Sequence, residues 1–181
     1  MKQKMKNFAL LMVTGCFITM NVYAESNAIS ASVGGAVGAG GTSTVLLVDY
    51  EHAFTDNFAL SGRVGHLSYS YSDEVYEEDG NGPGAQISAK FYPSGNALHN
   101  LYFGVGLGIW KMEGEWTDDK DTRWPTSDSI STSNAEIHGE LGWRLGEEVQ
   151  FVPSLQVGTF LSTEAMLAQF ISLNLGISFV F

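Results

Sequence analysis

The sequence predicts an all-β protein, an eight-stranded antiparallel up-and-down transmembrane β-barrel. In eight segments, apolar residues alternate with small or polar ones, which is the pattern of strands that separate two environments. The connections between these segments alternate between short and longer polar ones, as they do in membrane barrels. The last segment shows the alternation most clearly. Its large apolar residues are Ile171, Leu173, Leu175, Ile177, Phe179 and Phe181.

Residues 1–24 precede the predicted barrel and have the features of a cleaved secretory signal peptide. Three lysines give the first six residues a positive charge, residues 8–20 are mostly apolar, and Ala24 is a small residue suited to the cleavage site. The mature domain is then expected at 25–181. A lipoprotein processing box ending at Cys16 is the alternative, but it would leave part of the apolar stretch at the mature N-terminus.

The first four strands are expected at 28–37, 44–54, 58–71 and 84–92, where Val, Leu, Ile and Phe alternate with Ser, Gly and charged residues. The third of them begins with its apolar residues in one phase and ends with them in the other. We therefore predict a β-bulge near Gly65, because one extra residue reverses the facing of every residue after it.

The last four strands are expected at 101–113, 134–145, 149–161 and 169–181. In the first of these, large apolar residues alternate with Tyr102 and three glycines. The next two set them against charged and polar residues, and the final strand sets them against Ser, Asn and Gly. Each has about the length of a tilted membrane-spanning strand.

The connections indicate how the barrel is oriented. Short connections are expected at 55–57, 93–100 and 146–148, and longer polar ones at 72–83 and 114–133. The two long connections, with the neighbouring Glu113, contain eleven of the twenty acidic residues. Periplasmic turns are short and external loops long in such barrels. An even number of strands places both termini on the short-turn side.

Charged residues on the strands lie on the polar face, and we predict that this face lines the lumen. Each of them would cost up to about 2–4 kcal/mol at the middle of a membrane if it faced lipid. An eight-stranded barrel is narrow enough for side chains to fill it, so we expect a structural ion-pair network, with a narrow pore as the alternative. The network residues are Asp49, Glu51, Arg63, Lys90, Glu136, His138, Glu140 and Arg144.

Aromatic residues near the strand ends are expected to form interfacial girdles. The periplasmic girdle is predicted from Phe54, Phe58, Phe91, Trp143, Phe151, Phe179 and Phe181, and the external one from Tyr69, Tyr71, Trp110 and Trp116. A soluble barrel with an apolar lumen is the alternative. It is disfavoured because the polar face of the first and last two strands has almost no charge.

Residues 25–181 resemble the small outer-membrane β-barrel superfamily, the OmpA/OmpX-type and opacity-type surface proteins. The resemblance rests on the alternating final strand, 171–181, and its terminal Phe181. It implies a structural or surface-exposed protein of a Gram-negative outer membrane, in contact with lipids and lipopolysaccharide. It also implies transit with periplasmic chaperones and recognition of Phe179 and Phe181 by the barrel-assembly machinery. We expect no cofactor.

A lipid A-modifying enzyme is the second alternative to a structural role. His66 and Ser68 lie two residues apart on one strand face, a spacing that resembles the base and nucleophile of lipid A deacylases, with Glu78 as the acid that would orient the histidine. The surrounding residues match that family no further.

The acidic loops are candidates for binding divalent cations, which prefer carboxylate oxygens. Neither loop has the spacing of a preformed calcium loop, so solvated external loops are the main expectation. The candidate residues are Asp73, Glu74, Glu77, Glu78, Asp79, Asp118, Asp119 and Asp121. The formal net charge of −11 argues against nucleic acid as a partner.

Glycine tracts occur at 34–41 and 104–108. No helix pattern follows either tract, which excludes the geometry of a nucleotide-phosphate loop. We interpret the second as making room for bulky neighbours inside a narrow barrel.

Overall fold

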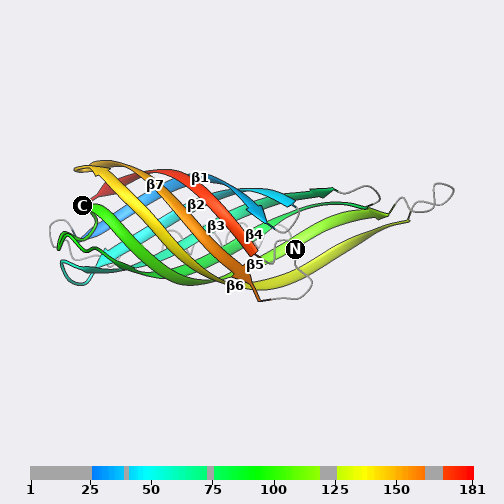
Figure 1. Ribbon diagram of the computed structural model, residues 1–181, viewed down its shortest axis with the longest axis horizontal. Coiled ribbons are helices and arrows are strands. Elements are labelled where there is room, and N and C mark those ends of the chain that lie inside the picture. The colour runs from blue at the N-terminus through cyan, green and yellow to red at the C-terminus, as the bar shows by residue number, and fades with distance from the viewer. Residues whose placement is uncertain (1–25, 39–40, 73–75, 119–125, 162–168) are drawn as a thin grey trace, which may run out of the picture.

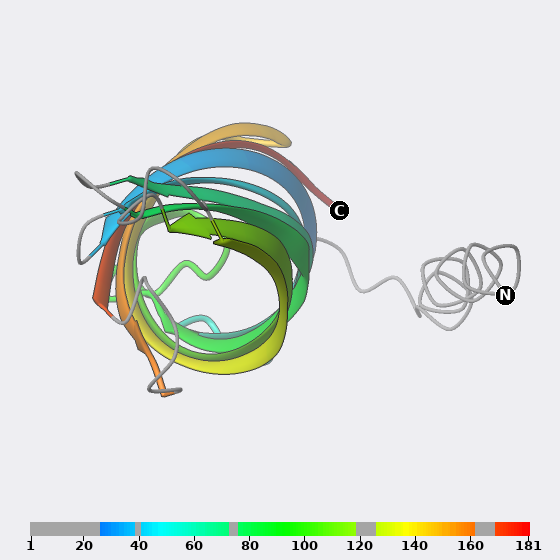
Figure 2. The same cartoon turned by 90° about the vertical axis from the view of Figure 1, so that its right-hand side faces the viewer.

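The eight-stranded barrel is confirmed by a computed structural model, which describes residues 26–38, 41–72, 76–118, 126–161 and 169–181. Each strand pairs antiparallel with the next, and β8 pairs back with β1 to close the ring (Figures 1 and 2). The strands are β1 (Asn27–Gly38), β2 (Gly41–Ala53), β3 (Phe58–Ser72), β4 (Tyr76–Phe91), β5 (Asn100–Asp118), β6 (Thr126–Gly146), β7 (Val149–Phe160) and β8 (Gln169–Val180). The described residues contain no helix long and apolar enough to cross a membrane.

The outer surface of the barrel carries an apolar belt. Every strand carries large, exposed apolar residues on its outward face, for example Leu107 at 56 % and Leu173 at 60 %. A water-facing sheet would place polar residues there, whereas lipid requires apolar ones. All seven aromatics predicted for the periplasmic girdle lie on this face, at the end where both described chain termini lie. We call this end the short-turn rim and the opposite one the hairpin rim.

The seam between β1 and β8 is closed to its end. Their register runs from Ala28 opposite Val180 to Gly38 opposite Phe170. Beyond it, the Asn27 N–H donates to the Phe181 carbonyl at 3.1 Å, and the Phe181 N–H donates to the Asn27 carbonyl at 2.8 Å. No open sheet edge is left at this seam within the belt, as a barrel in lipid requires.

The strands at the hairpin rim are longer than predicted. β4 starts at Tyr76, β5 runs to Asp118, and β6 starts at Thr126, so most of the predicted loops 72–83 and 114–133 are strand. The prediction failed because these extensions have no apolar face. Their outward faces are polar or charged, so they lack the alternation by which the belt was recognised. The extensions of β5 and β6 form the long hairpin that extends from the barrel in Figure 1, and the extension of β4 pairs with that of β5.

The predicted bulge near Gly65 is wrong. β3 pairs residue by residue with β2 and with β4 through this position, without an inserted residue. Leu67 and Tyr69 simply face the lumen, and His66 and Ser68 face outward. The assumption that the lumen is polar throughout misled the prediction, since its hairpin end is apolar. For the same reason Tyr69 and Trp110, expected in the external girdle, are instead buried inside the barrel.

The lumen consists of three layers. At the hairpin end, an apolar cluster gathers around Leu47, Trp110 and Phe170, and at the short-turn end a second one gathers around Tyr92, Leu98 and Tyr102. A band of buried polar and charged side chains lies between them.

The connection between β4 and β5 closes the short-turn end of the lumen. The sequence predicts a turn here, but the segment folds into the mouth of the barrel, with Ala97 and Leu98 buried in the apolar cluster at the short-turn end. The Gln150 amide donates to the Leu98 carbonyl at 2.9 Å, and the Asn57 amide donates to the Tyr92 carbonyl at 2.8 Å. This plug, residues 92–99, is visible inside the ring of Figure 2.

Candidate functional site

The eight charged residues predicted for the lumen all lie inside the barrel, and none is more than 7 % exposed. They come from β2, β3, β4 and β6, whose inward-facing positions coincide at mid-height. With the polar side chains that contact them, they form what we call the charged band.

Six of these residues form a charge-balanced cluster of three carboxylates and three cations. Arg63 donates from Nη2 to Glu140 at 2.5 Å and from Nε to Asp49 at 3.2 Å. Lys90 lies 3.2 Å from Asp49 and 2.6 Å from Glu51. The mutual attraction of equal numbers of opposite charges, together with their hydrogen bonds, compensates for the cost of removing these groups from water.

Arg144 completes the cluster and ties four strands together. Its Nη2 donates to Glu51 at 2.5 Å, and its Nη1 donates to Ser178 at 2.8 Å and to Gln150 at 3.1 Å. Its Nε donates to the Tyr92 hydroxyl at 3.1 Å, and that hydroxyl in turn donates to Glu51. β6 is thereby linked to β2, β7 and β8 across the lumen, and to the plug.

Glycines on β5 allow side chains two strands apart to meet. Ser88 on β4 and His138 on β6 both lie opposite Gly106, and Gln86 and Glu136 both lie opposite Gly108. A Cβ atom on Gly106 would lie 2.4 Å from Ser88 Oγ and 2.5 Å from His138 Nε2. The prediction that this tract makes room for bulky neighbours is confirmed.

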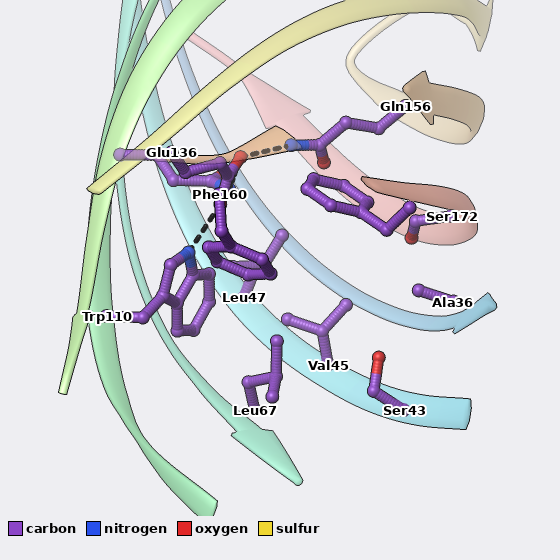
Figure 3. Close-up of a pocket in the computed structure, with 12 residues that line it drawn as sticks. Ala36, Ser43, Val45, Leu47, Leu67, Trp110, Glu136, Gln156, Phe160 and Ser172 are labelled. Atoms are coloured by element: carbon purple, nitrogen blue, oxygen red, sulfur yellow. Dashed lines mark hydrogen bonds between the residues drawn. The ribbon is translucent and has the colours of Figure 1, made fainter. Parts of the chain in front are cut away.

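Glu136, the fourth carboxylate, is held apart from the cations. It accepts from Trp110 Nε1 at 2.5 Å and from the amides of Gln86 and Gln156, each at 2.9 Å (Figure 3). His138 Nδ1 lies 2.6 Å away. Trp110 and two glutamines thus donate to this carboxylate, which lies at the edge of the band next to the hairpin-end apolar cluster.

Ser88, His138 and Glu136 have the connectivity of a hydrolase triad. Ser88 Oγ lies 2.9 Å from His138 Nε2, while Nδ1 of the same ring faces the carboxylate, as in a nucleophile–base–acid arrangement. All three residues are at most 2 % exposed, and none of the cavities described beside the band has Ser88 in its lining. A substrate has no room at this serine, so the three residues serve the packing of the lumen.

Two cavities lie inside the lumen beside the band, and both are small. One lies between the apolar cluster of the hairpin end and Glu136 and has a volume of about 20 Å³ (Figure 3). The other, beside Asp49 and Arg63, has a volume of about 30 Å³. Each has room for about one or two water molecules. Neither is large enough for a hydrated ion to pass.

The structure does not bring together His66, Ser68 and Glu78, the residues of the enzyme alternative. His66 and Ser68 face outward on β3, whereas Glu78 is buried on the inner face of β4, where it accepts from the Tyr69 hydroxyl at 2.6 Å. The two sheet faces separate the acid from the base, so Glu78 does not orient His66 in this structure.

The acidic residues considered for cation binding do not form a cluster where they are described. Glu77, Glu78 and Asp79 follow one another on β4 and so alternate between its two faces, and Asp118 ends β5. No group of three metal-ligating side chains occurs among the described residues. Asp73, Glu74, Asp119 and Asp121 lie outside them, as does the predicted signal peptide 1–24.

Sequence reasoning found the charged residues of the band but missed their neutral partners. Gln86, Gln150 and Gln156 donate to charged or backbone groups inside the lumen. Their position on the polar face of a strand was visible in the sequence. Which charge each would contact depends on the tilt and stagger of the closed barrel, which a single strand pattern does not contain.

No family model and no curated protein matches this sequence. Solved structures match its fold. The attachment invasion locus protein Ail of Yersinia pestis is 11 % identical, with 88 % of this chain and 100 % of that chain covered and a TM-score of 0.57. A major outer membrane protein of Thermus thermophilus is 15 % identical, with 86 % and 100 % covered and a TM-score of 0.55.

The Neisserial surface protein A, NspA, is 9 % identical, with 90 % of this chain and 100 % of that chain covered and a TM-score of 0.50. Identities this low establish a shared fold and nothing finer. The fold and the apolar belt together make this chain a membrane-spanning β-barrel.

Proposed function

We propose that this chain is a structural, surface-exposed barrel of the outer membrane whose lumen does not conduct. The observation that carries the proposal is the filled interior: the band, with its charge-balanced cluster, lies between two apolar clusters, and the plug closes one end. A barrel filled in this way presents its outer ends, and not its lumen, to other molecules.

The projecting hairpins are the surface that this protein offers to its surroundings. β6 pairs with β5 from Thr126 onward, but its pairing with β7 begins only at Glu136. Within the described residues, the first ten residues of β6 therefore have one strand neighbour, leaving a backbone edge of the kind that accepts another strand. Exposed carboxylates lie on the outward faces of the two preceding strands, Glu113 and Glu115 on β5 and Glu77 and Asp79 on β4, and Asp128 is exposed on β6 itself.

The orientation can be tested with two single-cysteine variants. We expect a membrane-impermeant maleimide to label Ser131→Cys, exposed on the projecting part of β6, in intact cells. It should label Ser94→Cys, exposed in the plug at the short-turn rim, only after the outer membrane is permeabilised. The native Cys16 precedes the barrel and is expected to be removed with the signal peptide. Labelling of Ser94→Cys alone in intact cells would contradict the proposed surface exposure of the hairpins.

A further inference from the structure

The short-turn rim contains a polar pocket that the proposed function does not use. It lies between the plug and the β6–β7 turn and has a volume of about 500 Å³, within the range of pockets that bind small molecules. Its walls include Asn96, His99 and Asn100 on one side and Glu147 and Glu148 on the other. We call it the rim pocket.

Its wall on the plug side is fixed in position. His99 lies between Leu98 and Asn100, whose φ angles of 66° and 63° are in the left-handed region, which is unfavourable for a bulky residue such as leucine. Burial of the Leu98 side chain and the bond from Gln150 to the Leu98 carbonyl hold this conformation. The same Gln150 amide lies 3.2 Å from His99 Nδ1. The imidazole is therefore held in place before any ligand binds.

The charge of the rim pocket is negative. Arg144 also lines it, but its guanidinium is occupied by Glu51, Gln150, Ser178 and Tyr92. No ion pair of the described residues involves Glu147 or Glu148, which are exposed in the turn. Their carboxylates remain available to a cationic ligand, and no third metal-ligating group joins them in the described residues. An organic ammonium fits this arrangement better than a metal ion.

We propose that the rim pocket binds the free amino end of a short peptide. The ammonium group would lie at Glu147 and Glu148, and the peptide groups would pair with the side-chain amides of Asn96 and Asn100, each of which offers two donors and an acceptor. Capture of an amino terminus is a known mode of peptide recognition. This inference does not depend on which way the hairpins face.

The test uses the folded, isotope-labelled full barrel in detergent micelles, titrated with trialanine and, in parallel, with N-acetyl-trialanine. We expect trialanine to cause saturable shifts of the backbone NMR signals of His99, Asn100 and Glu147. Acetylation removes the charge and should weaken binding about fivefold, as should Glu147→Gln with Glu148→Gln, because two exposed ion pairs are lost.

The matched control is Glu113→Gln with Glu115→Gln, which removes the same charge from the projecting hairpin and should leave the affinity unchanged. Glutamine at either exposed pair should leave the fold intact. Equal binding of the acetylated peptide, equal weakening by the control pair, or shifts that do not saturate at this pocket would each overturn the proposal.

Discussion

Replacing Arg144 by methionine is expected to lower the free energy of unfolding by about 3–5 kcal/mol, the usual effect of removing one partner from a buried ion pair. Methionine preserves much of the length of the side chain, so the loss is mainly that of charge and hydrogen bonds. Glu51 would keep Lys90 but lose the guanidinium 2.5 Å away, and Gln150 and Ser178 would each lose a donor. Urea-induced unfolding of the barrel from lipid vesicles measures this difference.

Two further variants show whether the buried charge causes the loss. Lys111→Met removes an exposed pair with Glu113 and should leave the free energy of unfolding nearly unchanged. Adding Glu51→Gln to Arg144→Met should recover part of the lost free energy of unfolding, because the double variant no longer buries the Glu51 charge without its Arg144 partner. If Arg144→Met were as mild as Lys111→Met, the charged band would not stabilise the barrel as described.

The second large effect is expected from Gly106→Ala. The added Cβ would lie 2.4 Å from Ser88 Oγ, 2.5 Å from His138 Nε2 and 2.6 Å from the Ile87 carbonyl. The two side chains can retreat only by giving up their mutual hydrogen bond, and the carbonyl belongs to the strand ladder. Overpacking of this kind costs about 1–3 kcal/mol, and the lost hydrogen bond adds about 1 kcal/mol.

The matched control for this variant is Gly62→Ala on β3. A Cβ there would meet nothing within 4 Å and would face outward, so the same chemical change should be nearly neutral in the same unfolding measurement. If both substitutions destabilised the barrel equally, the effect would come from the backbone flexibility of glycine. The contact of Ser88 with His138 across β5 would then not be the reason for glycine at position 106.

The belt was predictable because lipid imposes a strict rule on each strand separately. Every second residue must be apolar where the strand crosses the membrane, and this can be read from residues such as those of β8 without knowledge of their neighbours. The eight buried charges followed from the same rule, since a charge on a belt strand has only the lumen to occupy.

The features that escaped prediction depend on contacts between strands or on water. Leu67, Tyr69 and Trp110 are apolar residues inside the barrel, where the alternation rule assumes polar ones. The outward faces of the extensions of β4, β5 and β6 are polar or charged, so no apolar alternation marks them. The plug is held by Gln150 and Asn57, which come from other parts of the chain. No local sequence pattern in residues 92–99 indicates those hydrogen bonds.

Planar-bilayer recording of the purified, folded protein tests the central claim most directly. Because the charged band, the two apolar clusters and the plug fill the lumen, we expect the membrane current to remain at the level of a protein-free bilayer. Insertion is checked on the same sample by the different gel mobility of unboiled and boiled protein. Reproducible, stepwise conductance of the wild-type protein would contradict the claim that side chains close this barrel.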